Sequence, residues 1–409
     1  MSDTVTVSFE TLLRDPAVKA DPYPAYAGLR DLGDLVPTTF GDLVVTRHAD
    51  AFTVLRDTRF SSNSRHQPNH EQFTAMAEAV GLKDLHDLFE RVMLFADPPD
   101  HTRLRRIVGQ AFTPRTVEAM RPRIAAIVDD LLDRFEADGG GDLVEALAFP
   151  LPVTVISDML GVPAADHGLL RSWTADAVKA LDPADDISVF VPAAEAIRSM
   201  RSYFHDLVEE RRAHLGDDLL SAFILAEDEG DRLSHDELLD TTILLFGAGH
   251  ETTVNLISGG VLNLLRHPDE FARLLADPAG LLPSAVEELL RFGPPVQMTA
   301  RVATTDVSLA GTDIAKGTQL LVLVALANRD PLVFADPDRL DLGRADNRHL
   351  SFGGGIHLCL GAPLARLEGQ EAIGRLFQRF PGLALASDDD IAWKPTSTIR
   401  GPRELLLKV

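Results

Sequence analysis

Residues 352–361, with the sequence Phe-Gly-Gly-Gly-Ile-His-Leu-Cys-Leu-Gly, constrain this chain more than any other stretch. They contain Cys359, the only cysteine among 409 residues, preceded by three consecutive glycines. The residues from Pro363 to Phe377 are expected to form a helix. A thiol just before a helix N-terminus lies where backbone N–H groups and the helix dipole stabilise a thiolate. Adjacent glycines disfavour a core strand and predict a loop that can approach a flat or bulky group closely.

The residues of this loop leave three interpretations open. A single cysteine in an intracellular protein is commonly a small buried apolar side chain, and the glycines count against that interpretation. A nucleophilic cysteine would need a histidine base held by a further polar group, and His357 lies two residues before Cys359. The third interpretation is a thiolate that faces a flat group. Spacing alone does not decide among them.

The pattern Phe-Gly-x-Gly-x-His-x-Cys-x-Gly resembles the haem-ligand loop of the cytochrome P450 enzymes, the haem-thiolate monooxygenases, at all six fixed positions. The resemblance implies that Cys359 is the proximal axial ligand of haem iron and that Phe352 and Gly353 line the cofactor. Thiolate ligation pushes electron density onto iron and favours O–O cleavage. It further implies that His357 is a propionate partner rather than a base, and that the glycines let the loop pass close beneath the porphyrin.

Composition excludes several other classes of protein. The 39 Lys and Arg residues against 62 Asp and Glu residues give a net charge of −23, which disfavours nucleic acid and anionic membranes as partners. One cysteine rules out an internal disulfide and fits a reducing cytoplasm. The N-terminus, Met1–Thr4, lacks the order of charges of a signal peptide. The longest apolar runs fall short of the roughly 18 residues that suggest a membrane span. We therefore expect a soluble, cytoplasmic protein of the bacterial P450 type.

A long helix is predicted over residues 236–265, because Ser234 and Glu237 form a capping-box pattern at its start. Its middle contains two glycines, an acid and two threonines, which helix stability does not explain. The sequence from Ala248 to Thr253 resembles the oxygen-activation motif of the family. That resemblance implies that Ala248 lies against the haem, that Thr252 hydrogen-bonds the bound oxygen, and that Glu251 feeds protons. The alternative is a helix packed through small residues, with Thr252 bonded to a backbone carbonyl.

Haem carries two propionates, and half-buried carboxylates require cationic hydrogen-bond donors. Prolines followed by an acid mark a helix start before residue 100. His101 and Arg105, four residues apart, share one face of that helix. They match the family positions for propionate contacts, as does Arg301, whereas Arg103 and Arg106 are expected to point elsewhere.

A second motif is interpreted as structural. Glu288 and Arg291 are three residues apart on a predicted helix and form a same-face ion pair. The family buries this pair and adds a later arginine, for which Arg339 holds the matching position. Leu340 departs from the aromatic residue that the family usually has there.

The substrate pocket is predicted only by resemblance. The loop over 61–71 and the segment that follows it to Phe95, including Leu94, are expected to cover the substrate, and the helical region 165–215 is expected to be a movable lid. Val296 and Met298 are expected to face the pocket, and the turn near Thr398 to reach it.

These observations predict a single, triangular, mainly α domain over 1–409 with the cytochrome P450 fold, a smaller β-rich part and a loosely ordered segment over 1–20. The predicted activity is insertion of one oxygen atom from O₂ into a C–H or C=C bond of a mainly apolar small molecule, such as a polyketide, terpenoid, steroid or fatty acid. The cofactor is haem b (iron protoporphyrin IX), and the enzyme is expected to be a monomer. No flavin or nicotinamide fingerprint is present, so electrons are expected from a ferredoxin and its reductase, docked near Arg103, Arg106 and Arg348.

Three other functions stay open at this point. A peroxygenase would use hydrogen peroxide, although the Glu251–Thr252 pair argues against it. A haem sensor would bind haem without turnover, and a cysteine hydrolase would bind no haem.

Overall fold

One helix, α14 (His235–Leu265), crosses the structure and positions the elements around it. It begins at a complete capping box: the Glu237 N–H donates to Ser234 Oγ, and the Ser234 N–H donates to the Glu237 carboxylate. At 1.5 Å per residue the helix is about 45 Å long. The predicted helix and its cap are confirmed. The computed structural model describes residues 13, 15–184, 186–228, 233–387 and 391–409.

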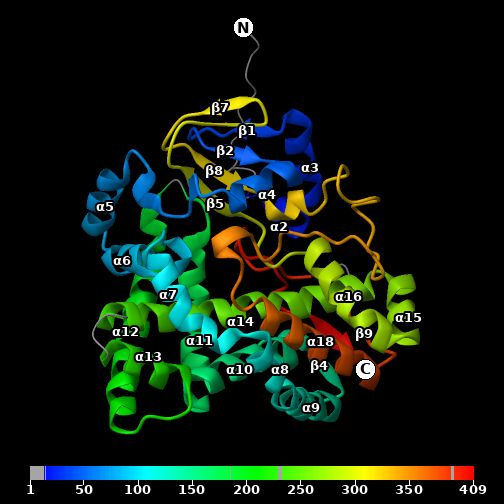
Figure 1. The fold of residues 1–409 in the computed structure, drawn as a ribbon. Coiled ribbons are helices and arrows are strands. Elements are labelled where there is room, and N and C mark those ends of the chain that lie inside the picture. The colour runs from blue at the N-terminus through cyan, green and yellow to red at the C-terminus, as the bar shows by residue number, and fades with distance from the viewer. Residues whose placement is uncertain (1–12, 14, 185, 229–232, 388–390) are drawn as a thin grey trace.

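Most of the described chain is helical (Figure 1). Besides α14, the α-helices are α2 (Pro16–Ala20), α3 (Tyr23–Leu32), α4 (His48–Arg56), α5 (His70–Ala79), α6 (Lys83–Arg91), α7 (Asp100–Gly109), α8 (Pro114–Ala119), α9 (Arg121–Ala137), α10 (Pro150–Leu160), α11 (His167–Ala177), α12 (Val191–Ala213), α13 (Leu219–Asp228), α15 (Pro268–Ala276), α16 (Pro278–Phe292), α17 (Val324–Ala327) and α18 (Ala362–Arg379). The helix expected after the cysteine loop is therefore present as α18.

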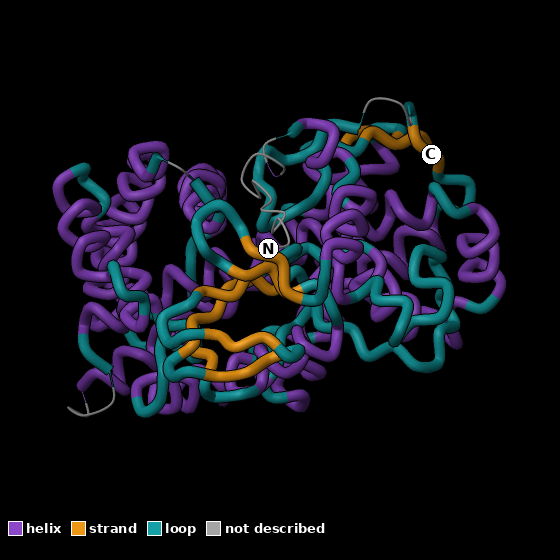
Figure 2. The backbone as a smooth tube through the Cα atoms, turned by 90° about the horizontal axis from the view of Figure 1, so that it is seen from above, coloured by secondary structure: helices purple, strands orange, loops and turns teal. Residues whose placement is uncertain are grey.

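The strands form a smaller part. The main sheet has the order β1 (Leu35–Pro37), β2 (Leu43–Val45), β8 (Gln319–Val322), β5 (Thr299–Ala303) and β3 (Phe60–Ser61). Its pairs are antiparallel except β2 with β8, where Val44 aligns with Leu321. A second sheet has the order β4 (Gly140–Asp142), β10 (Leu406–Lys408) and β9 (Ala384–Leu385), and β6 (Val307–Leu309) pairs with β7 (Thr312–Ile314). Figure 2 shows the main sheet gathered beside the helices, with the second sheet apart from it near the C-terminus.

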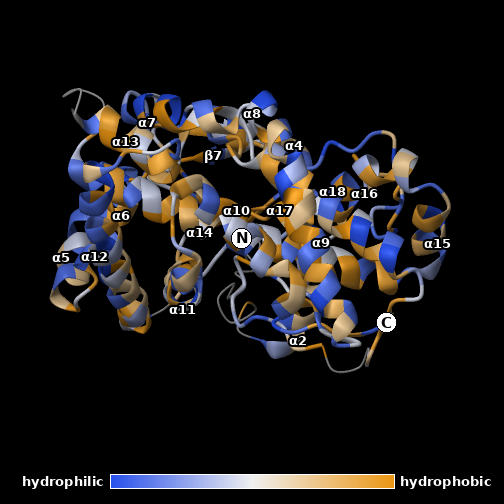
Figure 3. Cartoon of the chain, turned by 90° about the horizontal axis from the view of Figure 1, so that it is seen from below, coloured by the Kyte–Doolittle hydropathy of each residue, from blue (hydrophilic) through white to orange (hydrophobic). Residues whose placement is uncertain are grey.

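The core follows this division. The largest hydrophobic cluster joins α14 to the helices around it, including α10, α12, α16 and α18. A second cluster lies under the main sheet, and a third includes Tyr26, Met298 and Leu321 near the N-terminal helices. Hydrophobic and hydrophilic positions alternate around helices such as α9 and α15, so that one face of each turns inward (Figure 3). The predicted mainly α architecture with a smaller β-rich part is confirmed.

Two peripheral segments, residues 16–20 and 140–141, form regular secondary structure. Residues 16–20 form α2 and Leu13 is buried, so the prediction of a loose segment over 1–20 is wrong there; residues 1–12 and 14 lie outside the described part. In the glycine run over 139–141, Gly140 and Gly141 pair with β10. Within the described ranges, none of the helices combines the length and apolar character that crossing a bilayer requires.

Candidate haem-thiolate site

The cysteine loop is held by backbone hydrogen bonds at the start of α18. The Cys359 N–H donates to the Phe352 carbonyl at 2.8 Å, and the Gly353 N–H donates to Leu350 at 2.8 Å. Gly353 adopts a φ of 70°, a left-handed conformation that favours glycine. Gly361 is the N-cap of α18, so Cys359 lies just before a helix N-terminus, as predicted.

Opposing influences act on the Cys359 thiol. Its side chain has accessible surface, yet the surrounding protein raises the thiol pKa by desolvation. The N–H groups of Gly361 and Ala362 and the guanidinium of Arg105 act in the other direction, because each favours a negative sulfur. Desolvation is the larger effect. A metal cation at the sulfur would complete the stabilisation of the thiolate.

Two glycines of the loop lie close to the end of a neighbouring helix, α4. A Cβ on Gly355 would lie 2.7 Å from the Leu55 carbonyl oxygen, and Gly355 has a φ of 64°. A Cβ on Gly354 would meet Leu55 and Arg56. The close approach of these two glycines is therefore to the end of α4.

Two histidines and an arginine converge beside the loop. The His101 and His357 rings lie 4.5 Å apart between centroids, and His357 Nε2 is 3.0 Å from Ser62 Oγ. Arg105 Nη2 donates to the Leu358 carbonyl at 2.6 Å. His101 is 3% exposed, and its Nδ1 has no hydrogen-bond partner among the residues the structure describes. A buried ring nitrogen without a partner indicates that this cluster is built for a further group.

Arg301 on β5 completes this group of hydrogen-bond donors. It is 7% exposed and donates to Thr299 Oγ1 at 3.2 Å and to the Ala300 carbonyl at 2.7 Å. Burial lowers the Arg301 pKa to about 10, and Asp97 partly opposes the shift. Burial, followed by the charges of Arg301 and His101, lowers the pKa of His357 to about 3.

The charge of Asp97 acts on this cluster from a distance, while its carboxylate accepts hydrogen bonds from other residues. Ser61 Oγ lies 2.7 Å from both of its oxygens, and His66 Nε2 lies 2.8 Å from one of them. His101, Arg105, Arg301 and His357, hereafter the cation cluster after its two arginines, are thus a set of donors that a group bearing carboxylates would satisfy. The residues present fit haem, whose propionates would meet the cation cluster and whose iron would meet Cys359.

The middle of α14 presents an accessible face. Ala248 is exposed and Thr252 is partly exposed, whereas Phe246, His250 and Thr253 are buried. Thr252 Oγ1 donates to the Ala248 carbonyl at 3.1 Å, which is the backbone bond expected from the alternative interpretation of the motif. The hydroxyl oxygen keeps its capacity to accept a hydrogen bond. This face is the part of α14 that a cofactor and a substrate would cover.

Glu251 has an ion-pair partner that the sequence did not predict. Lys394, from the C-terminal segment, donates from Nζ to Glu251 Oε1, and both side chains are largely buried. The pair joins the middle of α14 to residues 143 positions later in the chain. Any proton transfer by Glu251 must begin from this paired state.

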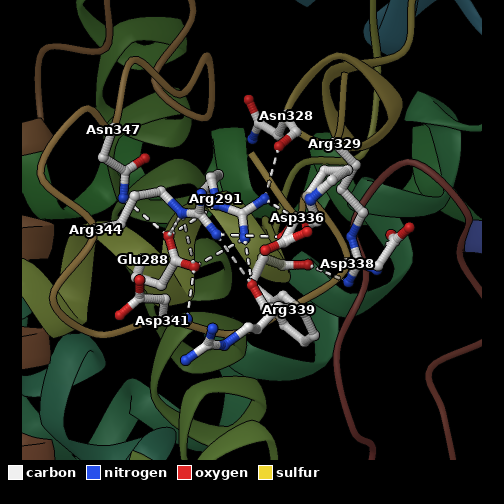
Figure 4. Close-up of polar contacts among 12 residues, drawn as sticks. Glu288, Arg291, Asn328, Arg329, Asp336, Asp338, Arg339, Asp341, Arg344 and Asn347 are labelled. Carbon is white, nitrogen blue, oxygen red and sulfur yellow. Dashed lines mark hydrogen bonds and ion pairs between the residues drawn. The ribbon is translucent and has the colours of Figure 1, made fainter. Parts of the chain in front are cut away.

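The Glu288–Arg291 pair is fully buried, as predicted. The two side chains are 0% exposed and make two hydrogen bonds of 2.8 Å. The third cation is Arg344, whose Nε lies 3.1 Å from Glu288 Oε2. Arg339 was predicted for this role, but its side chain is exposed, and it contributes only its carbonyl oxygen, at 3.1 Å from Arg291 Nη2 (Figure 4). The prediction of Arg339 is wrong because the chain turns there and directs Arg344 inward instead.

Further bonds satisfy the rest of this buried cluster. Arg291 Nη1 donates to the carbonyls of Asn328 and Pro337, and Asn347 Nδ2 and the Asp341 N–H donate to Glu288. Each charge therefore has its partners inside the protein, which fits a structural role.

The predicted pocket residues divide into two groups. Leu94 is 43% exposed and Val296 is partly exposed, so both are accessible to a ligand. Met298 is 4% exposed and packs in the N-terminal hydrophobic cluster, so it offers a ligand little surface. Thr398 is 8% exposed; its hydroxyl donates to the Leu181 carbonyl and its N–H to Asp182, which fastens the turn to the loop between α11 and α12.

The three arginines expected to receive an electron donor differ in their pairing. Arg103 pairs with Glu237 and Asp100, and Arg348 pairs with Asp346 at 2.7 Å. Arg106 is exposed. Among these three arginines, the positive charge of Arg106 is the most accessible to a docking partner.

Several residues of the site escaped sequence reasoning. Ser62 lay in a loop already marked by its polar composition, but its contact with His357 spans 295 positions. Lys394 and Arg344 carried no local signal, because nothing near them in the sequence specifies a buried acid as partner. Residues 336–344 contain aspartates, a proline and a glycine, a composition that favours an irregular path but does not say which arginine turns inward.

Comparison with known proteins agrees with this geometry. The Cytochrome P450 family model matches residues 65–277 and 280–406. Cytochrome P450 monooxygenase PikC of Streptomyces venezuelae is 45% identical over 398 residues, covering 95% of this chain and 91% of that protein. Polyketide biosynthesis cytochrome P450 PksS of Bacillus subtilis is 40% identical over 369 residues, covering 90% and 89%. The crystal structure of P450BioI with an acyl carrier protein superposes with a TM-score of 0.89 at 37% identity, covering 96% and 99%. The chain belongs to the cytochrome P450 family of monooxygenases.

Proposed function

We propose that this P450 monooxygenase inserts one oxygen atom from O₂ into a C–H or C=C bond of a mainly apolar molecule of the polyketide, terpenoid, steroid or fatty-acid type. The observation that carries the proposal is the cation cluster beside Cys359, which includes a buried His101 nitrogen without a partner in the described chain. The polyketide class comes first, because PksS, which is 40% identical to this chain, is a cytochrome P450 of polyketide biosynthesis.

The cofactor proposed is haem b. Cys359 would ligate the iron, and His101, Arg105, Arg301 and His357 would bind the propionates, while Phe352, Gly353 and Ala248 would contact the ring. When bound, haem b supplies the oxygen activation and the one-electron chemistry of the reaction. The protein supplies the thiolate, the orientation of the ring and the control of water.

Two residues of α14 would manage protons. Thr252 has accessible surface on the cofactor face, and its oxygen can accept a hydrogen bond while its proton bonds Ala248. Glu251 would pick up protons after its carboxylate leaves Lys394. Because Lys394 occupies Oε1 of Glu251, a transfer at that oxygen requires the contact to open.

Electrons would come from a small ferredoxin and its reductase. The exposed Arg106 would contribute local positive charge to the docking surface on an otherwise acidic protein. An Arg106→Glu variant is expected to be reduced more slowly and with a weaker dependence on salt. Unchanged reduction kinetics in that variant would remove Arg106 from the docking surface.

The substrate class is tested by titrating a panel of polyketides, terpenoids, steroids and fatty acids into the ferric enzyme and recording the spin-state shift. Compounds that bind are then incubated with a ferredoxin system under isotopically labelled O₂. Incorporation of one labelled atom, dependent on electrons, is the expected result. Turnover with hydrogen peroxide alone, at the same rate as with O₂ and electrons, would instead indicate a peroxygenase.

A further inference from the structure

Two histidines and a glutamate meet away from the haem-thiolate site. One ligand atom from each of His70, His86 and Glu90 lies within 4.8 Å of the other two, and all three residues are half-buried. The His70 and His86 rings are 5.8 Å apart between centroids. Imidazole nitrogen and carboxylate oxygen are the ligand types, with thiolate, that zinc prefers in proteins.

The secondary structure brings these side chains together. His86 and Glu90 are four residues apart on α6, so they project from the same helix face. His70 is the first residue of α5, which packs against α6. Thr74 Oγ1 donates to the His70 carbonyl at 3.0 Å and lies 3.0 Å from His86 Nε2, so it joins the His86 ring to the turn that carries His70.

We propose that His70, His86 and Glu90 bind one Zn²⁺ ion, with a water molecule in the fourth position. Three protein ligands from two helices match the ligand number of zinc sites that keep one position open. Glu90 also pairs with Arg65, and its other oxygen lies 3.3 Å from Ser64 Oγ. The ion would share the carboxylate with Arg65 or take its place.

Zinc at this site would also help to hold in place the segment 62–66, which runs beside the cation cluster. The same short stretch that supplies Ser64 and Arg65 to Glu90 supplies Ser62 to His357 and His66 to Asp97. Zinc would fasten α5 to α6 and, through Glu90, this stretch. The proposal does not depend on the proposed substrate or on the electron donor, because zinc binding is measured directly.

The test uses tag-free, haem-loaded enzyme treated with a chelator and then titrated with zinc sulfate against a chromophoric competitor. One equivalent is expected to bind. His86→Ala and His70→Ala are each expected to weaken binding about tenfold or more, since even loss of a supporting residue around a metal costs roughly that much. Circular dichroism and the haem spectrum of each variant report whether it has folded.

His205 provides a matched control. It forms another close histidine pair, with its Nδ1 3.2 Å from His235 Nε2 on α14, outside the proposed site. His205→Ala is expected to bind zinc as the parent enzyme does. Unchanged affinity in folded His70→Ala, or loss of binding in His205→Ala instead, would overturn the proposal, as would the absence of any stoichiometric binding to the parent enzyme.

Discussion

The cation cluster and the Glu288–Arg291 cluster both bury positive charge, but they differ in the partners that this charge has inside the protein. Arg291 is 0% exposed and has a carboxylate and three carbonyl oxygens as partners. Arg301 is 7% exposed and has one hydroxyl and one carbonyl as partners.

This difference in partners distinguishes residues that stabilise the fold from residues that bind a ligand. A buried charge whose partners are all internal stabilises the fold around it. A buried charge that lacks an acidic partner raises the free energy of the protein alone, and a ligand of opposite charge recovers that free energy on binding. Arg291 therefore has a structural role, whereas the cation cluster is suited to bind the carboxylates of a ligand.

The largest effect is expected from breaking the satisfied cluster. Glu288→Gln removes the charge that Arg291 and Arg344 share, and leaving a buried cation unpaired costs on the order of 3–5 kcal/mol. Urea denaturation of the haem-loaded enzyme measures the loss of free energy of unfolding.

Arg339→Ala is the matched control for that experiment. Its side chain is exposed and only its backbone carbonyl bonds Arg291, so the change should be within about 0.5 kcal/mol. Equal destabilisation by the two variants would contradict the assignment of Arg344, in place of Arg339, as the third member of the cluster.

Glu368 on α18 offers a third case, a buried acid without a cation. Its oxygens meet the geometric criteria for a hydrogen bond with no residue in the part of the chain that the structure describes. Burial raises its pKa to about 8, and the nearby Thr253 side chain acts in the opposite direction. The native state keeps the proton while the unfolded state loses it near pH 4.5. Stability should therefore fall as the pH rises from about 4.5 to about 8, by up to about 1.4 kcal/mol per pH unit.

Glu368→Gln should remove that contribution. The amide cannot ionise, so denaturation curves of the variant should depend less on pH between 5 and 8 than those of the parent enzyme. An unchanged pH dependence would mean that Glu368 is already charged in the folded protein, and the buried acid would then need a cation that the structure does not place beside it.

Unlike Glu288→Gln, Arg301→Met should weaken haem binding and leave the stability of the protein itself intact. The haem-free protein should keep its stability, because an unsatisfied buried charge is replaced by an apolar chain of similar length. Haem loss to an acceptor apoprotein should become about tenfold faster, since one charge-assisted bond is worth roughly 1.5–3 kcal/mol. Arg106→Met is the surface control, and faster haem loss in that variant would show that the effect is not specific to the cation cluster.

The smallest effect on binding, but a clear one on chemistry, is expected from Thr252→Ala. The side chain bonds only its own helix at Ala248, so stability should change little. Product formed per electron pair consumed should fall several-fold if the hydroxyl directs protons, whereas Thr252→Ser should retain most of the coupling. Equal coupling in the alanine and parent enzymes would leave Thr252 with only its bond to Ala248.

The sequence predicted the local features of this molecule well. The capping box at Ser234, the helix after Cys359 and the pairing of Glu288 with Arg291 follow from spacing and from chemistry within a few residues, whereas the burial of that pair was implied by the family resemblance. The family resemblance supplied His101 and Arg301, which lie far from Cys359 in the chain.

The failures share a physical cause. Whether Arg339 or Arg344 turns inward depends on the path of an irregular loop, and no periodic pattern encodes that path. Likewise, the burial of Met298 depends on packing in the N-terminal cluster, which the sequence near Val296 does not specify. Lys394 and Glu251 meet only because the C-terminal segment returns to the middle of α14.

The most direct test of the haem-thiolate assignment is the absorption spectrum of the reduced enzyme with carbon monoxide, for the parent protein and for Cys359→His. The parent enzyme should show the long-wavelength Soret band of a thiolate-ligated haem. The variant should keep its fold and lose that band, because imidazole donates less electron density than thiolate. A parent spectrum without the thiolate band, or a folded Cys359→His protein that retains it, would contradict the assignment of Cys359 as the iron ligand.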